Sequence, residues 1–158
     1  MQLQGRMCLR VRSEQGELLA ERRAENIVLR QGAAIVARLF ASATGASAVT
    51  AVQVGFGQEA ASAETTALTP PPPTPAIPSE AMRSPVTAAD FSIITDKPGM
   101  IQVLVSSVFH PTVNLADVSE AGLLAGDQLY NQVVFEPVTL RVGQDITFFW
   151  EIDFPFGH

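Results

Sequence analysis

The side chains that could do chemistry are few in this sequence. Histidine occurs twice, at His110 and His158, and cysteine once, at Cys8. A catalytic histidine needs a nucleophile within hydrogen-bonding reach and a carboxylate that orients it. The chain lacks the G-x-S-x-G turn that presents a serine nucleophile in many hydrolases. We therefore interpret His110 as a loop residue and expect no catalytic residue and no enzyme activity. An active site would require His110 to lie beside Asp117 or Glu120.

The acidic residues do not form a metal-binding pattern. Calcium takes about six to eight oxygen ligands, usually from a dense acidic loop. The carboxylate pairs available for a metal are Asp90 with Asp96, Asp117 with Glu120, and Glu151 with Asp153. A single cysteine excludes an intrachain disulfide and a cysteine-based metal site, and we expect Cys8 to be buried in the first strand. The segment Val54–Gly57 lacks the third glycine of a dinucleotide fingerprint. The sequence thus predicts no metal and no cofactor.

The elements that must position these side chains are mostly strands. The clearest is residues 146–154, where large apolar residues alternate with mainly polar ones, the pattern of a strand with one buried face. It contains the only tryptophan, so we expect the main apolar cluster here. We also interpret Trp150 and Tyr130 as packing residues and not as sugar-binding aromatics. The residues we expect in the core are Val52, Val54, Phe56, Val103, Val105, Phe135, Ile146, Phe148, Trp150 and Ile152.

The order of elements predicts the fold class. Apolar residues at helical spacing indicate one helix over residues 30–42. Short strands with turn signals at intervals of about ten residues indicate an antiparallel sheet. Pro137 is expected to interrupt a strand, because it cannot donate to a sheet ladder. We therefore predict a mainly β fold, an antiparallel β-sandwich with one α-helix, in a single domain over residues 1–158.

Residues 58–87 form the least regular part of the chain. Seven of the eleven prolines lie between positions 70 and 85. Such a run favours extended polyproline II and cannot pair as a central strand. We expect an extended proline-rich loop or arm that lies over its own domain or a neighbouring subunit, and deleting residues 69–78 should then abolish assembly without unfolding the protein. The alternative is a PxxP ligand for an adaptor domain.

Charge is unevenly distributed along the chain, whose net charge is −6. Residues 1–38 carry seven arginines and four acidic residues, and the remainder carries three basic and twelve acidic residues. A basic start and an acidic end could bind head to tail, although a solvated, uneven surface is the alternative. An acidic chain without aromatic residues among its basic ones argues against nucleic-acid binding. No apolar run is long enough for a signal peptide or a membrane span. The residues we expect at an interface are Pro70, Pro71, Pro72, Pro73, Pro75, Ile77, Pro78, Arg10 and Arg12.

Several short segments, taken in order, carry a resemblance. An Asn26-led segment enters the helix, Val54-Gly55-Phe56-Gly57 ends a strand, and Thr66-Ala67-Leu68 follows; near the end come Ser119-Glu120-Ala121-Gly122-Leu123 and then Phe135-Glu136-Pro137 with Trp150-Glu151-Ile152-Asp153-Phe154. This order, over residues 26–154, resembles tailed-bacteriophage virion structural proteins of the tail-fibre or baseplate-associated type. The proline tract and the N-terminal hairpin, residues 6–22, depart from that pattern.

The resemblance implies a non-enzymatic virion component. It would assemble with copies of itself and with other phage structural proteins in the tail, baseplate or neck, and could anchor a fibre. It would be located in the virion, and in the host cytoplasm before assembly, with no nucleic-acid or membrane partner. Two alternatives are a capsid decoration (cement) protein and a carbohydrate-binding module that recognises the host surface through an exposed aromatic residue such as Phe156.

Overall fold

The computed structural model describes residues 4–157, so that His158 lies outside the described range. It is mainly β, with one α-helix and two short 3-10 helices. The elements in chain order are β1 (Gln4–Arg12), β2 (Leu18–Val28), α1 (Arg30–Phe40), β3 (Ala51–Gly55), η1 (Ser79–Met82), β4 (Arg83–Pro85), η2 (Ala88–Asp90), β5 (Phe91–Ile94), β6 (Met100–Phe109), β7 (Leu115–Ala125), β8 (Gln128–Leu129), β9 (Asn131–Leu140) and β10 (Asp145–Pro155).

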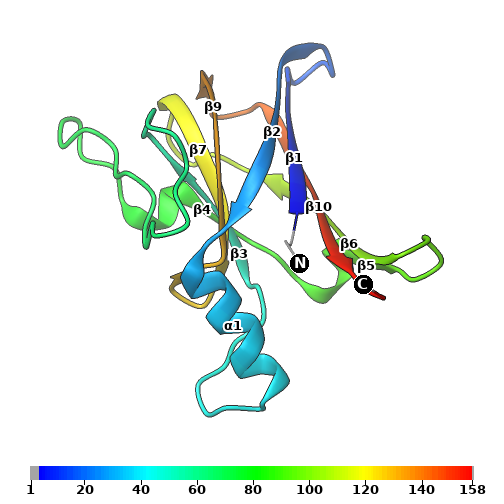
Figure 1. The fold of residues 1–158 in the computed structure, drawn as a ribbon. Coiled ribbons are helices and arrows are strands. Elements are labelled where there is room, and N and C mark those ends of the chain that lie inside the picture. The colour runs from blue at the N-terminus through cyan, green and yellow to red at the C-terminus, as the bar shows by residue number, and fades with distance from the viewer. Residues whose placement is uncertain (1–3, 158) are drawn as a thin grey trace.

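All ten strands belong to one antiparallel sheet that curls into a half-barrel (Figure 1). The order is β4-β3-β7-β9-β2-β1-β10-β6-β5, with β8 beside β7. The curl brings β4 back towards β6, where Ser84 Oγ donates a hydrogen bond to the carbonyl oxygen of Val108 at 2.9 Å. The predicted mainly β, antiparallel fold with one helix is confirmed. A sandwich of two separate sheets is not, because β2 pairs with β1 along most of its length and with β9 at Ile27 and Val28.

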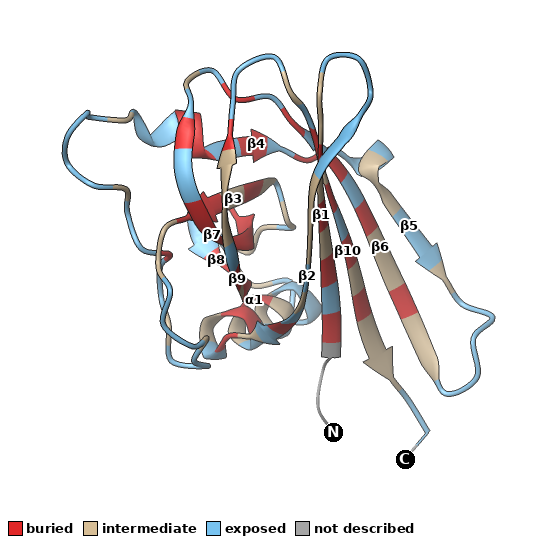
Figure 2. Cartoon of the chain, turned by 90° about the horizontal axis from the view of Figure 1, so that it is seen from above, coloured by how far each residue is buried: buried red, intermediate tan, exposed pale blue. Residues whose placement is uncertain are grey.

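The core fills the inside of the curl. Buried residues of β1, β10 and β6 face buried residues of β3, β7 and β9 (Figure 2). The rings of Phe148 and Trp150 stack with centroids 6.4 Å apart, and Phe109 meets Phe148 edge-on at 6.0 Å. Eight of the ten predicted core residues are buried, while Phe56 and Val103 are half-buried and pack against the core. The alternation predicted for the last strand is confirmed from Asp145 to Ile152, whereas Asp153, Phe154 and Pro155 are all half-buried.

The predicted break at Pro137 is wrong, because β9 runs through this residue without interruption. The ladder between β7 and β9 shifts register between Val118 and Glu120, so Pro137 lies where regular pairing is already interrupted. On the other side of β9, the Arg22 guanidinium donates to the carbonyl oxygens of Glu136 at 2.8 Å and Pro137 at 3.1 Å. A side chain thus provides the hydrogen bonds that a neighbouring strand would make.

Two other expectations need correction. Cys8 lies in a strand as predicted but is only half-buried, because it shares the outer face of β1 with Arg10 and not the inner face with Met7 and Leu9. Residues 58–87 are not one extended arm, because positions 79–85 fold as η1 and β4. Residues 58–78 form a loop that projects from the body of the molecule (Figure 1). No helix within the described residues is long and apolar enough to cross a membrane.

Candidate functional site

A buried carboxylate ties the long loop after β3 to the sheet. Glu120 of β7 is 2% exposed. Its Oε1 accepts hydrogen bonds from the backbone N–H of Gly57 at 2.7 Å and of Thr69 at 2.9 Å, and its Oε2 accepts one from Gln132 Nε2 at 2.8 Å. A buried carboxylate needs such donors, because burial without them is very costly. This side chain, together with the hydrogen bond from the Phe56 N–H to the carbonyl oxygen of Thr69 at 3.1 Å, closes residues 57–69 into a loop.

Two glycines make room for this carboxylate. A Cβ atom on Gly55 would lie 2.8 Å from Glu120 Oε1, and one on Gly57 would lie 2.7 Å from it. The hydroxyl of Ser119 donates to the carbonyl oxygen of Gly57. The V-G-F-G and S-E-A-G-L segments are therefore the two sides of one contact. Both glycines are therefore approached closely by a side chain, that of Glu120.

The helix and the T-A-L segment join the same region. The backbone N–H of Arg30 donates to the carbonyl oxygen of Ala63 at 2.8 Å, and its guanidinium lies 2.7 Å from Glu64 Oε1. Gln31 Nε2 donates to the carbonyl oxygen of Thr66 at 2.9 Å. Below these contacts, four leucines form a second apolar cluster, namely Leu29, Leu68, Leu124 and Leu129. We call this contact region between α1, the 57–69 loop, β7 and β9 the Glu120 joint.

A third glycine sets the distance between α1 and the chain that enters β9. A Cβ atom on Gly32 would lie 2.0 Å from the carbonyl oxygen of Tyr130, a separation that real atoms do not reach. The helix therefore packs directly on backbone. Tyr130 is buried, and burial raises the pKa of its phenol to about 12. Its hydroxyl has no hydrogen-bond partner within residues 4–157.

The proline tract, Pro70–Pro78, is held at the surface between two anchors. Thr69 at its start is bonded to Glu120, and Ile77 near its end packs against the core. Within the tract Pro71 and Ile77 are half-buried and the other residues are exposed. The prolines predicted to lie at an interface are thus open to a neighbouring molecule.

The arginines near the N-terminus have partners within the chain. Arg10 lies 3.5 Å from Glu21 Oε2, with its guanidinium over the Phe149 ring at 5.4 Å, and Arg12 donates to the carbonyl oxygen of Gly16 at 3.2 Å. Exposed pairs of this kind contribute about 0–1 kcal/mol each. They nevertheless reduce the positive charge available to a neighbour. Internal ion pairs or hydrogen bonds are made by Arg6, Arg10, Arg12, Arg22, Arg23, Arg30 and Arg38.

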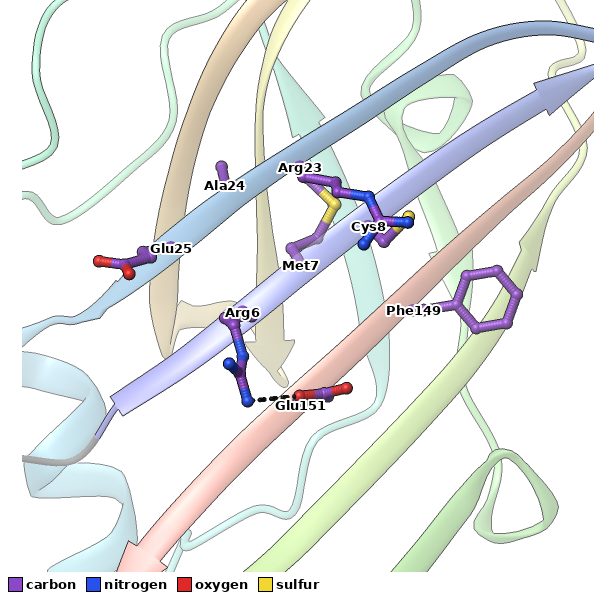
Figure 3. A pocket seen from close by; sticks show the side chains of 8 residues that line it. All are labelled: Arg6, Met7, Cys8, Arg23, Ala24, Glu25, Phe149 and Glu151. Carbon is purple, nitrogen blue, oxygen red and sulfur yellow. Dashed lines mark ion pairs between the residues drawn. The ribbon is translucent and has the colours of Figure 1, made fainter.

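A shallow hollow of about 490 Å³ lies on the outer face of β2, β1 and β10 (Figure 3). Cys8 is at its centre, opposite Arg23 of β2 and Phe149 of β10 in the strand register. Arg6 pairs with Glu151 at 2.9 Å. Arg23 pairs with Glu21 at 2.6 Å, and this hydrogen bond holds the pKa of Glu21 below its ordinary value. Because both cations are already paired, the hollow does not offer a strong anion site.

A second hollow, of about 360 Å³, contains His110, the one histidine within residues 4–157. Glu14, Asp145 and Ser13 also line it. The Ser13 hydroxyl accepts hydrogen bonds from the backbone N–H of Gln15 at 3.3 Å and Glu17 at 3.1 Å, which fixes a turn. Asp117 and Glu120, the carboxylates considered for an active site, do not line this hollow. Within residues 4–157 there is no group of three metal-binding side chains. His110 lies in the β6–β7 connection, as predicted.

An apolar strip crosses the inner face at the far end of the sheet. The register aligns Ile93 of β5 with Val103 of β6, and Ile101 of β6 with Phe154 of β10. Phe156 continues the strip, since its N–H donates to the carbonyl oxygen of Gly99 at 3.0 Å. Ile93 is 67% exposed and Phe156 is 51% exposed. The strip was not predicted, because the alternation in β6 indicates a buried face and does not show where the curled sheet ends.

Comparison with known proteins adds no relative to this picture. No family model, no curated protein and no solved structure matches the chain. The candidate regions are therefore the Glu120 joint, the proline tract and the apolar strip, each defined by the contacts above. Sequence reasoning placed the proline tract at the surface but missed the role of Glu120. The sequence signal for a buried carboxylate was Glu120 directly before the apolar run 121–125, together with Gly55 and Gly57, which leave space for its side chain.

Proposed function

We propose that this protein is a non-enzymatic structural component of a tailed-bacteriophage virion, in the tail, baseplate or neck. It would assemble with copies of itself and with other virion proteins, and could anchor a fibre there. The observation that carries the proposal is the Glu120 joint. The segments that resemble phage structural proteins are short, and chance alone would scatter them over the fold.

Four of these segments instead lie together. The V-G-F-G, T-A-L and S-E-A-G-L segments and the start of α1 meet around Glu120 and Tyr130. Together they hold residues 57–69 against the sheet. This supports a resemblance in architecture and not in isolated motifs, and architecture is what a repeated building block uses to position its contact surfaces.

The size of the surface also supports assembly. A compact monomer of this mass exposes about 7700 Å² by the scaling of surface with mass. This chain, of 16.9 kDa, exposes 8908 Å². The excess of roughly 1200 Å² is comparable to the roughly 800 Å² per partner that a standard interface buries. Projecting elements account for such an excess, and an oligomer would cover them.

Light scattering on the purified protein, over a range of concentrations, tests the proposal. A closed ring such as a trimer or hexamer would support a structural component and would give its symmetry. A strict monomer at every concentration would contradict self-assembly. Binding to isolated phage tails and not to heads would separate the tail proposal from the capsid decoration alternative.

The carbohydrate-binding alternative rests on a different observation. Phe156 is exposed, as a sugar-stacking ring must be, whereas Trp150 is 1% exposed and cannot contact a ligand without unfolding β10. Binding to a glycan array that is lost in Phe156→Ala would favour this alternative. Unchanged binding, or no binding by the unmodified protein, would count against it.

A further inference from the structure

We propose that the proline tract of one copy docks on the apolar strip of the next copy, in a head-to-tail contact. The strip consists of Ile93, Ile101, Val103, Phe154 and Phe156. This inference rests on the proposed self-assembly and names the two surfaces that carry it. Neither surface is used by the Glu120 joint or by the hollows described above.

The tract is suited to burial. Positions 65–79 carry no charged side chain, so docking them removes no ion from water. Prolines have little conformational freedom to lose, and polyproline segments bind aromatic-lined grooves for that reason. The anchors at Thr69 and Ile77 fix both ends of the tract and reduce the entropy cost further.

The strip offers matching chemistry. Its five side chains are aliphatic or aromatic, and two of them are more than half exposed, Ile93 and Phe156. Full burial of a large apolar side chain is worth about 1.5–3 kcal/mol relative to exposure. Proline rings pack well on aromatic faces, and Phe154 and Phe156 supply such faces at the end of β10. An aromatic, uncharged strip is therefore a better partner for the tract than the outer face of β1, whose arginines are already paired.

The dimensions agree as well. Four consecutive prolines in polyproline II span about 9 Å. The strip crosses from β5 over β6 to β10, which are two strand spacings, or about 10 Å. Pro70–Pro73 can therefore cover the width of the strip, and the bend of the chain at positions 73–75 begins at the end of this segment.

The position of the two surfaces determines the type of assembly. The loop that contains the tract projects on one side of the molecule, and the β5–β6 end of the sheet lies on the other (Figures 1 and 2). A contact between different surfaces on opposite sides is heterologous, so it repeats into a closed ring or an open filament. A nine-residue tract is smaller than the roughly 20–30 residues per side of a standard interface. One contact is thus weak, and a ring becomes stable because each copy makes two.

The test uses three variants of the whole protein. The loop variant carries Pro71→Ser, Pro72→Ser and Pro73→Ser. The strip variant carries Ile93→Ser and Phe156→Ser. The matched control is Phe40→Ser, because Phe40 is 94% exposed at the end of α1, away from both surfaces. Light scattering gives the mass of each, and circular dichroism with a thermal melt verifies folding. Phe156→Ser alone replaces the strip variant if the double change unfolds.

A mixture of the loop and strip variants distinguishes the outcomes. We expect the unmodified protein and Phe40→Ser to form the same oligomer and each of the other variants to be monomeric. At concentrations raised well above those at which the unmodified protein assembles, an equimolar mixture should then form a dimer and nothing larger. One copy supplies an intact strip and the other an intact tract, and the high concentration compensates for the weakness of this single contact. A monomeric unmodified protein would refute the proposed self-assembly itself. Oligomers that persist in both variants, or monomeric variants that fail to pair when mixed, would overturn this contact and leave self-assembly standing.

Discussion

Removal of the Glu120 carboxylate should loosen the loop that it closes. Glu120→Ala leaves three donors without their acceptor, namely the N–H groups of Gly57 and Thr69 and the amide of Gln132. The Gln132 donor is buried, so leaving it without an acceptor costs about 1–3 kcal/mol of the free energy of unfolding. The two backbone donors are partly buried and recover some water, at about 0.5–1.5 kcal/mol each. The expected loss is about 2–6 kcal/mol, a large part of the roughly 5–15 kcal/mol that stabilises a domain.

The isosteric change to glutamine makes a sharper comparison. Gln132 Oε1 has no hydrogen-bond partner among the described residues. In Glu120→Gln the new amide can keep its oxygen towards Gly57 and Thr69 and direct its NH₂ towards Gln132, which flips its own amide to accept. The N–H groups of Gly57 and Thr69 keep their acceptor and the buried charge is removed, but the flip moves the Gln132 NH₂ to the place of its unpartnered oxygen and leaves one buried donor without an acceptor. We therefore expect Glu120→Gln to cost about 1–3 kcal/mol, less than Glu120→Ala.

Urea unfolding of the three proteins measures these free energies. Amide hydrogen exchange at Gly57 and Thr69 shows whether the loop opens locally in Glu120→Ala before the sheet unfolds. A loss below 1 kcal/mol for Glu120→Ala would refute the reasoning. So would an equal loss in Glu120→Gln, because the charge and not the hydrogen bonds would then stabilise the loop.

Three further changes test other contacts. Gly32→Ala should destabilise by about 1–3 kcal/mol through its clash with Tyr130, whereas an open helix position would gain about 1 kcal/mol; thermal melts give the sign. Arg22→Met should cost about 1–3 kcal/mol in urea unfolding, because Glu136 and Pro137 lose charge-assisted donors. Burial raises the pKa of Tyr130 from 10.0 to about 12. The contribution of the protonated phenol to the free energy of unfolding is therefore complete below pH 10, and about 2–3 kcal/mol of that free energy is lost as the pH rises through 12. Tyr130→Phe should lack this loss, and ultraviolet titration of this single tyrosine should show the raised pKa directly.

Local periodicity was enough to predict the strands and the buried face of the sheet. Residues such as Ile146, Phe148 and Trp150 alternate because a strand exposes successive side chains to opposite faces, and this holds for any neighbours. Cys8 illustrates the same rule. The alternation of Met7 and Leu9 with Arg10 placed it on the arginine face, and only its general preference for burial suggested the core.

Strand neighbours could not be predicted from the same signals. Whether strands form two sheets or one curled sheet depends on β2, which pairs with β1 and then with β9, more than 100 residues along the chain. Pro137 is tolerated because of a register shift that only pairing reveals. The role of Glu120 depends on two loop N–H groups that come close only after the loop has closed. Such contacts depend on tertiary structure, which periodicity does not encode.

The Glu120 joint and the proposed docking contact lead to one last prediction. Thr69 directly precedes the proline tract and is bonded to Glu120, so the joint limits the motion of a segment that should bind a neighbour. If the joint opens, docking must order the loop again, at about 1–2 kcal/mol for each backbone residue fixed. Glu120→Ala should therefore weaken assembly at least tenfold, the equivalent of about 1.4 kcal/mol, although Glu120 itself is buried and contacts no neighbour. Glu120→Gln should assemble normally, and light scattering across a dilution series compares the two. Equal assembly of both variants, with the loop of Glu120→Ala shown to be open by hydrogen exchange, would mean that the tract does not carry the contact.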